Sequence, residues 1–362
     1  MTNNFKPYFD RQTTGVIKGI ALIMMFLHHF FTFPEWWVEG VYYRRISILS
    51  QYFRAPLKLC VPIFCFITGY FYYYNKNKTI KYSLKKISDI LISYWFVFFV
   101  LAAVAVNISG YKYQTVNFIK ELFAIYRPTM CFCWYVFFYM VFMMILPIIV
   151  KALSKNIHFD CLICFFLCPL LSSLLKYFID DSIANEIIGY MNSFFPVVIL
   201  GYIFSSYGFF EKMGNINDSI IKNGFLNGII YILCLAVVPM GRWFAPKITM
   251  PLKYIGYVDL SLDVVYTPVF IYCAVNLFKI IDWKLLNAIL FQIGNYSLLM
   301  WFYSCIFYNN SKRVFQPILY FPHNPIIVFI WGIILCFIPS YLSDKFVIKK
   351  LQKLKNKLFF EK

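Results

Sequence analysis

The chain has 362 residues, of which 61% are hydrophobic and only 14% charged, and its mean hydropathy is +0.67. This composition excludes a water-soluble globular protein, and also disordered, collagen-like and coiled-coil chains. The formal net charge is +18. The basic residues are spread between apolar runs instead of gathered into one soluble patch, so nucleic acid is not an expected partner.

Apolar runs recur along the whole chain, each near the length of about 20 residues that a membrane-crossing helix needs. They lie near 15–33, 57–74, 87–108, 130–150, 159–177, 187–206, 224–240, 260–278, 286–308 and 324–342. We therefore predict an all-α integral membrane protein with about ten transmembrane helices and no soluble domain. Cys161, Cys164 and Cys168 have a metal-like spacing, but no second Cys/His cluster completes it, so we predict buried thiols and no metal site.

The basic residues also predict the orientation. With ten crossings, the side that holds both termini carries 21 of the 34 Lys and Arg residues, so both termini should be cytoplasmic. We divide the chain into a cytoplasmic N-terminal segment (1–14), a transmembrane domain (15–342) and a basic cytoplasmic tail (343–362). The tail suits either an amphipathic helix on an anionic leaflet or a solvated topology signal. The expected location is the cell (plasma) membrane, as a multi-pass protein in the lipid bilayer.

The first apolar run contains three ionisable residues, Lys18, His28 and His29. Ionisable side chains are costly inside a membrane, so each is a candidate functional residue. At 3.6 residues per turn, Lys18 and His29 share one helix face to within about 20° and lie roughly 16 Å apart along the axis. Lys18 lies near the cytoplasmic end of the run and His29 lies deeper, where an imidazole needs a polar cavity or a hydrogen-bond partner. Hydrogen-bonded interfacial histidines are the alternative interpretation.

Four segments occur in the order found in a known membrane family. Lys18 followed after ten residues by His29 resembles the opening motif of the membrane-bound acyltransferase family 3. The segment 61–70 (VPIFCFITGY) resembles the second-span motif of that family, with Thr68 in place of serine. The segment 133–136 (CWYV) and the segment 293–301 (IGNYSLLMW) resemble two later motifs. Together with the ten runs, the resemblance covers nearly the whole chain.

This resemblance implies transfer of an acyl group, usually acetyl, from cytoplasmic acetyl-CoA to a hydroxyl of an extracytoplasmic glycan or glycolipid. The acyl-CoA is a co-substrate, and no permanently bound cofactor is expected. His29 takes the position of the essential histidine, as general base or transient acyl carrier, and Lys18 takes that of the basic residue that meets the CoA phosphates. Further expected CoA contacts are Lys81, Lys85 and Lys86, where the family often has arginines. Expected residues of the substrate pocket are His28, Thr68, Gly69, Tyr70, Trp134, Ser297 and Trp301.

Some features favour other interpretations. After Trp301, where relatives commonly carry histidine, this chain has Phe302 and Tyr303. Several residues of the outer loops suit either an anionic or sugar acceptor or simple interfacial anchoring, namely Trp36, Trp37, Arg44, Arg45, Arg54 and Lys58. A polysaccharide polymerase or glycosyltransferase would use outer carboxylates such as Glu35 and Glu39. A transporter of polysaccharide precursors would use carboxylates such as Asp259 and Asp263, although no inverted repeat is visible.

Overall fold

The structure, a computed structural model, describes residues 8–33, 52–102, 108, 110, 112, 114–153, 156–178, 182–220, 223–252, 256–281, 283–308 and 312–360. Glu35, Trp36, Trp37, Glu39, Arg44 and Arg45, which the sequence analysis singled out, lie outside these residues. The described residues form two compact units. Unit 1 comprises the described residues of 1–25, 52–78 and 148–295, and unit 2 those of 26–51, 79–147 and 296–362.

Helices make up nearly all of both units, as the sequence predicts. The α-helices within unit 1 are α3 (Cys60–Tyr74), α8 (Ile157–Leu162), α9 (Cys168–Phe178), α10 (Ser182–Tyr207), α11 (Phe209–Ile220), α12 (Gly224–Phe244), α13 (Asp263–Ile280) and α14 (Lys284–Asn295). Those within unit 2 are α4 (Ile80–Val97), α6 (Thr115–Leu122), α15 (Ser297–Cys305), α16 (Lys312–Tyr320), α17 (Pro325–Ser343) and α18 (Lys349–Phe359). Two helices carry residues of both units, α1 (Arg11–Phe31) and α7 (Trp134–Ala152).

Eight helices of the described residues are long and apolar enough to cross a membrane, or nine when α14 and α15 are counted as one broken span. The chain is therefore a polytopic helical membrane protein. The expected run at 87–108 is absent from this set. Its described part is α4 and a π-helical turn, Phe98–Ala102, and it continues into residues 103–107, outside the described part of the chain.

A short hairpin departs from the all-helical prediction. The strands β1 (Lys247–Leu252) and β2 (Gly256–Ser261) pair antiparallel between α12 and α13, with Thr249 opposite Asp259. This connection is too short and too polar to cross a bilayer, and pairing its two arms satisfies the backbone groups of both. The hairpin fixes the position of Asp259 in front of α13.

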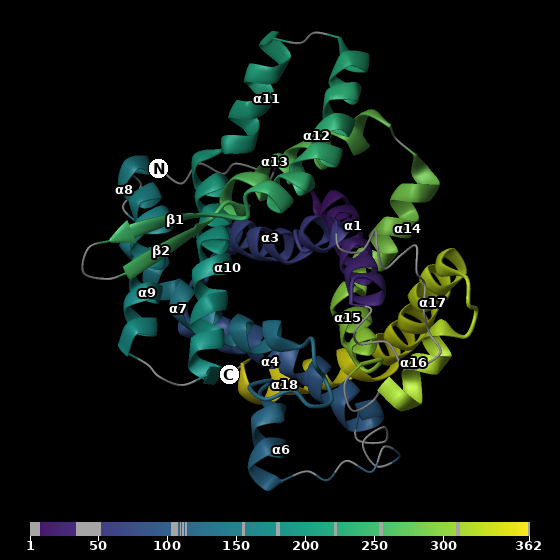
Figure 1. Cartoon of the computed structure of the whole chain (residues 1–362). Helices are drawn as coiled ribbons and strands as arrows, with labels where there is room; N and C mark the ends of the chain where they lie inside the picture. The colour runs from purple at the N-terminus through teal and green to yellow at the C-terminus, as the bar shows by residue number, and fades with distance from the viewer. Residues whose placement is uncertain are drawn as a thin grey trace. The chain divides into compact units, whose positions relative to one another are not determined.

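Unit 1 is held together by close contacts between helix backbones. In Figure 1, α3 crosses directly against α10. A Cβ atom on Gly69 would lie 1.7 Å from the carbonyl oxygen of Val198, and one on Gly201 would lie 2.2 Å from that of Phe66. Small residues of this kind allow membrane helices to approach closely and pack.

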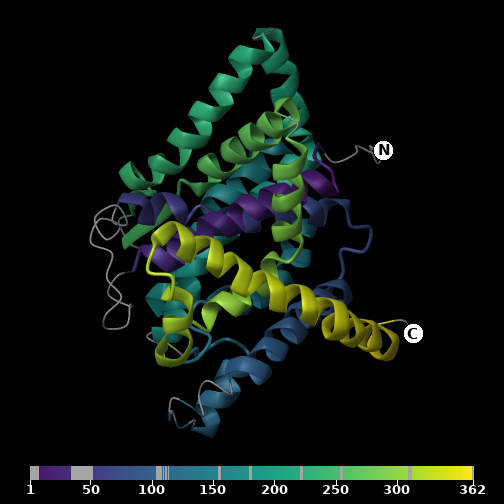
Figure 2. The same cartoon turned by 90° about the vertical axis from the view of Figure 1, so that its right-hand side faces the viewer.

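In unit 2, α17 continues through a π-helical turn (Asp344–Ile348) into α18, and Figure 2 shows the two as one long rod. Helix α18, which is cytoplasmic in the predicted topology, packs against α4 and forms an ion pair with it. Lys355 of α18 is 8% exposed, and its Nζ lies 2.5 Å from the Asp89 carboxylate. The same Nζ donates to the Lys85 carbonyl oxygen (3.3 Å), so the basic tail packs beside the α4 lysines.

Candidate active site

The C-terminal end of α1 carries His29, and three of its last four carbonyl groups accept hydrogen bonds. The last four C=O groups of a helix have no partner within the helix, and leaving them buried and unpaired is costly. Thr32 donates through its backbone N–H and its hydroxyl to the His28 oxygen (3.2 and 2.6 Å). The Tyr308 hydroxyl donates to the His29 oxygen (2.7 Å) and the Tyr320 hydroxyl to the Phe30 oxygen (2.5 Å). These bonds fix the helix end and therefore the base of the His29 side chain.

The His29 imidazole is buried among aromatic rings. The residue is 9% exposed, and its ring stacks on Phe132 with centroids 4.0 Å apart and an interplanar angle of 14°. Phe132 in turn meets the ring of Tyr308 edge to face at 5.1 Å. Among the described residues, no hydrogen-bond partner lies against the buried Nδ1 atom of His29. Within the described residues, Nδ1 of His29 therefore lies among apolar side chains without a hydrogen bond.

His28 has different surroundings, although it is the next residue. Its Nδ1 lies 3.3 Å from the Thr32 hydroxyl, and its ring meets Phe33 edge to face at 5.0 Å. Successive helical residues point about 100° apart, but the two imidazole rings still contact each other, with centroids 5.5 Å apart. The two histidines differ in hydrogen bonding: Nδ1 of His28 lies beside the Thr32 hydroxyl, whereas Nδ1 of His29 has no partner among the described residues.

Phe132 is held in place by a buried carboxylate. Glu121 is fully buried, and its Oε1 accepts hydrogen bonds from the backbone N–H groups of Thr129 (2.9 Å) and Met130 (3.0 Å). The Thr129 hydroxyl also donates to Oε2 (3.3 Å). These bonds order the turn just before Phe132 and α7. Glu121 thus fixes, through the backbone, the aromatic face that covers His29.

The predicted cationic residues lie on two helices. Lys18 is half-buried on α1, and no residue breaks the helix between it and His29, so the helical spacing expected from the sequence is present. Lys81, Lys85 and Lys86 follow the N-terminus of α4, which Thr79 caps by accepting from the Tyr82 N–H (3.3 Å). The positive end of the helix dipole and three lysines there concentrate positive charge, which suits a phosphate group.

The remaining predicted pocket residues serve mainly as packing groups within their units. In unit 1, Thr68 donates to the Phe64 carbonyl oxygen of its own helix (2.8 Å), Gly69 allows the approach of α10, and Tyr70 stacks on Phe9 at 4.5 Å. In unit 2, Trp301 is 8% exposed and meets Tyr135 edge to face at 5.9 Å. Trp134 begins α7 and Ser297 begins α15.

Four further residues of this region are not predicted from the sequence, namely Phe132, Tyr308, Tyr320 and Glu121. The tyrosines carry no sequence signal, because they are two of 29 and their partners on α1 are 279 and 290 residues away. Glu121 carries a weak signal, as an acidic residue shortly before an apolar run. Among the described residues, no three His, Cys, Asp or Glu side chains come together as metal ligands.

This arrangement can accept a proton at His29. Protonation would place a positive charge at the negative end of the α1 dipole and against the face of Phe132, and both interactions favour a cation. A neutral imidazole in this position could take a proton from a substrate hydroxyl, so the geometry suits a general base.

The chain matches the model of one protein family. The model of the acyltransferase 3 family, an acyltransferase domain, matches residues 13–344. That range contains all but the first two residues of α1, including Lys18 and His29, and it extends through α17. Neither the curated proteins nor the solved structures contain a match to the chain.

Proposed function

The chain belongs to the acyltransferase 3 family and is a multi-pass membrane acyltransferase, and we propose that it moves an acetyl group from cytoplasmic acetyl-CoA to a hydroxyl of an extracytoplasmic polysaccharide or glycolipid. The observation that carries the proposal is the His29 imidazole, buried on the family-matched α1 helix with an Nδ1 atom that has no hydrogen-bond partner among the described residues. We further propose that both termini are cytoplasmic and that the enzyme resides in the cell membrane.

The donor side of the proposal is supported by the positions of the lysines. CoA has an anionic nucleotide end and a thioester end joined by a long neutral arm. Lys18 lies on the same α1 face as His29, roughly 16 Å away along the axis by helical geometry. Lys18 would meet the phosphates as a point charge. Lys81, Lys85 and Lys86, at the start of α4 in unit 2, are separate candidates for the same chemistry. The thioester would then reach the end of α1.

The transfer itself follows from the imidazole. His29 takes the proton of the acceptor hydroxyl as its oxygen attacks the thioester carbon. The tetrahedral intermediate expels the CoA sulfur as the new ester forms, and the imidazolium returns the proton to that sulfur. The products are the acetylated acceptor and free CoA, so atoms and charge balance. The stacked Phe132 ring and the helix end stabilise the imidazolium that exists between the two proton transfers.

The polymerase and transporter interpretations lose support once the family is established. Asp259 and Asp263, the carboxylates that favoured a transporter, are each paired with a cation, Lys247 and Arg242 respectively. Paired carboxylates of this kind can be structural. Glu35 and Glu39, which favoured a polymerase, lie outside the described residues.

The test is the ester-linked acetyl content of surface glycan in cells that make wild type or His29→Ala. A positioned general base contributes about 10²- to 10⁴-fold to a rate. We therefore expect His29→Ala to lower acetyl transfer by at least about 100-fold while its level in the membrane stays that of wild type. Labelled acetyl-CoA supplied to inside-out membrane vesicles gives the same measurement with a defined donor.

The matched control is His158→Ala. His158 is an exposed histidine on the short helix α8, so its loss should leave transfer unchanged. Full activity in well-inserted His29→Ala protein would contradict the proposed role of this histidine. Label from acetyl-CoA that never reaches glycan or glycolipid in the wild type would contradict the proposed acceptor.

A further inference from the structure

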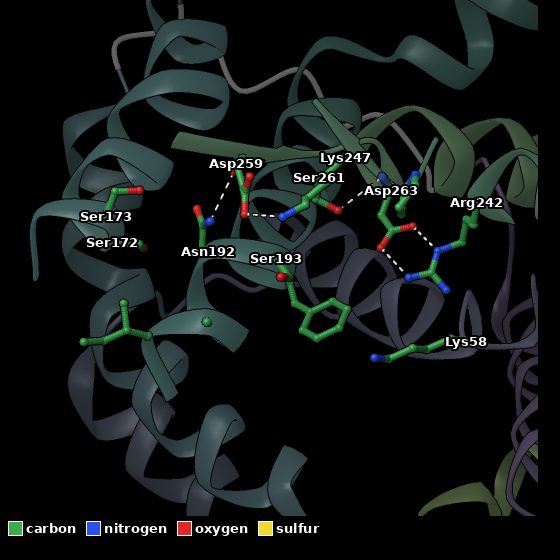
Figure 3. A pocket seen from close by; sticks show the side chains of 14 residues that line it. Lys58, Ser172, Ser173, Asn192, Ser193, Arg242, Lys247, Asp259, Ser261 and Asp263 are labelled. Carbon is green, nitrogen blue, oxygen red and sulfur yellow. Dashed lines mark hydrogen bonds and ion pairs between the residues drawn. The ribbon is translucent and has the colours of Figure 1, made fainter. Parts of the chain in front are cut away.

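Unit 1 contains a polar pocket with a cavity volume of about 440 Å³, within the range typical of small-molecule sites. Its walls come from the hairpin and from the ends of several helices, and Figure 3 shows the charged side chains that line it. The topology predicted from the basic residues places all of these helix ends on the extracytoplasmic side. Nothing in the proposed chemistry at His29 accounts for a pocket of this kind.

Two ion pairs form part of the wall. The Arg242 guanidinium faces Asp263 as a fork, with Nε 2.6 Å from Oδ1 and Nη2 donating to Oδ2 at 3.1 Å. Arg242 also donates to the Ala55 carbonyl oxygen (2.7 Å). Lys247 lies 2.6 Å from Asp259, which accepts a further hydrogen bond from the Thr249 hydroxyl (2.7 Å). Each carboxylate is thus matched by one cation.

Lys58 is the third cation of the pocket, and no ion pair joins it to a described residue. In Figure 3 its amino group extends from the α3 side and no dashed line connects it to the other labelled groups. Three cations line the pocket against two carboxylates, both of which are already paired. Counted over the described residues that line it, the pocket therefore carries one positive charge more than its carboxylates compensate, at an exposed lysine.

A hydrogen-bond acceptor on the wall is also unsatisfied. Asn192 donates through Nδ2 to the Asp259 carbonyl oxygen (3.1 Å), and this bond fixes which end of the amide is the N–H₂ group. Its Oδ1 is buried, and among the described residues it has no donor. A buried acceptor without a donor is unfavourable, and a ligand hydroxyl would satisfy it. The hydroxyls of Ser172, Ser173, Ser193 and Ser261 also line the pocket.

We propose that this pocket binds an acidic sugar unit of the acceptor glycan, with Lys58 meeting its anionic group and Asn192 Oδ1 accepting from a sugar hydroxyl. That the ligand is the acceptor rests on the proposed function. A carboxylate of a uronate residue and a phosphate on the sugar offer the same anionic chemistry, and lysine binds either as a point charge. Arg242 and Asp263 frame the pocket instead of binding the ligand, because their charges are already matched.

Binding to purified full-length protein in lipid nanodiscs tests this proposal, with isothermal titration and three probes. The probes are a tetrasaccharide of alternating glucuronate and N-acetylglucosamine, glucose 1-phosphate, and the neutral N-acetylglucosamine tetramer. We expect at least one anionic probe to bind about tenfold or more tightly than the neutral one, and to weaken as salt is raised. A preference for the tetrasaccharide identifies a carboxylate ligand, and a preference for glucose 1-phosphate identifies a phosphate.

Three variants assign the binding to Lys58. Lys58→Met should weaken the preferred probe about tenfold, and Lys58→Arg, which keeps the charge, should stay within about threefold of wild type. Lys112→Met removes an exposed lysine elsewhere on the predicted outer side and should bind as wild type does. The proposal is overturned if wild type binds no anionic probe at millimolar concentration, if the neutral probe binds equally well, or if Lys58→Met binds normally.

The outcome is separable from that of the proposed function, because binding needs neither acetyl-CoA nor His29. If His29→Ala binds the anionic probe but wild type transfers no acetyl group, the pocket stands and the proposed function fails. If acetyl transfer requires His29 and Lys58→Met leaves both probe affinity and the acceptor KM unchanged, the proposed function stands and the pocket fails.

Discussion

Two buried polar regions of this molecule are built on opposite plans. In unit 1, Arg242 and Asp263 are 8% and 2% exposed and neutralise each other through a two-point contact. In unit 2, His29 is 9% exposed and its ring stacks on Phe132. Its backbone carbonyl oxygen accepts a hydrogen bond from the Tyr308 hydroxyl. In the ion pair, each charged group has a partner of opposite charge. The Nδ1 atom of His29, by contrast, has no hydrogen-bond partner among the described residues.

This difference in pairing indicates that the ion pair supports the fold, whereas the histidine is available to react with a substrate. A buried pair that is fully matched gains little by reacting with a ligand, and its loss leaves an uncompensated charge in a poorly solvated place. A buried base without a partner contributes little to stability, but it can take a proton from a substrate. Substitutions in the two regions should therefore differ in kind, the first affecting folding and the second affecting transfer.

The largest effect on stability is expected at the Arg242–Asp263 pair. Removing one member, as in Arg242→Ala or Asp263→Ala, leaves the other charge buried and alone, which costs about 3–5 kcal/mol. We expect either variant to show a strongly lowered midpoint of thermal unfolding in detergent and a reduced amount of protein in the membrane. By contrast, His29→Ala should unfold close to the wild-type midpoint while losing transfer.

The control is the double variant Arg242→Met/Asp263→Leu, which removes both charges and keeps apolar volume. Replacing a buried pair by apolar groups is often neutral for stability, so this variant should recover most of the lost midpoint. A double variant as unstable as the worse single one would show that the hydrogen bond from Arg242 to Ala55 matters more than the charges.

A smaller effect on stability is expected for Glu121→Gln, and this substitution should also lower the rate of transfer. The carboxylate holds Thr129 and Met130 by charge-assisted bonds, and such bonds contribute about 1.5–3 kcal/mol each at most. Glutamine has nearly the same shape but is neutral, so we expect a modest loss of stability together with a looser Phe132. Turnover at saturating acetyl-CoA should fall while the KM for acetyl-CoA stays near wild type.

Glu121→Asp gives the matched control, since it keeps the charge and shortens the reach. If the position of Phe132 is what matters, both variants should lower turnover. Unchanged turnover in both, with lowered stability, would assign Glu121 to the framework alone and would remove the link between this turn and His29.

The sequence predicted those features that depend on local order along the chain. Runs of apolar residues predict spans because the thickness of the bilayer sets their length. The His29 prediction depends on local order in the same way, since it needs one helix and one motif, and its catalytic role stays a prediction. Features set by distant pairs were not predictable. Tyr308 meets α1 across 279 residues, and nothing in a single sequence marks which of 29 tyrosines will do so.

The polar pocket shows the same limit. The sequence offered Lys58 and the carboxylates Asp259 and Asp263 as separate outer-side residues, with anchoring and transport among their possible roles. Their convergence depends on the hairpin, which brings Asp259 to Lys247, and on the pairing of α12 with α13. Which of these charges are paired, and hence which one remains for a ligand, follows only from the three-dimensional arrangement.

The smallest effect is expected at Asp10, a carboxylate whose partners resemble those of Glu121 but which is exposed to water. Asp10 precedes α1, and its Oδ1 accepts from the Thr13 N–H at 2.8 Å. This bond holds the pKa of Asp10 below its ordinary value of 3.8. A pKa lowered in the folded state means that the ionised group stabilises the fold above the unfolded pKa, and that this stabilisation is lost as pH falls through the folded pKa.

Asp10→Ala should therefore be less stable than wild type at pH 7 by about 1 kcal/mol, the usual contribution of a helix cap. The gap in stability should begin to narrow as pH falls below the unfolded pKa of about 4, and it should close only as pH falls through the lower pKa of the folded state. Asp10→Asn keeps a capping oxygen and does not titrate, so its difference from Asp10→Ala should stay constant with pH. Thermal midpoints in detergent at pH 7 and pH 3 measure both gaps. If Asp10→Ala loses as much stability at pH 7 as Arg242→Ala does, burial does not set the free-energy cost of losing a paired charge in this protein. The contrast between the two polar regions would then need another cause.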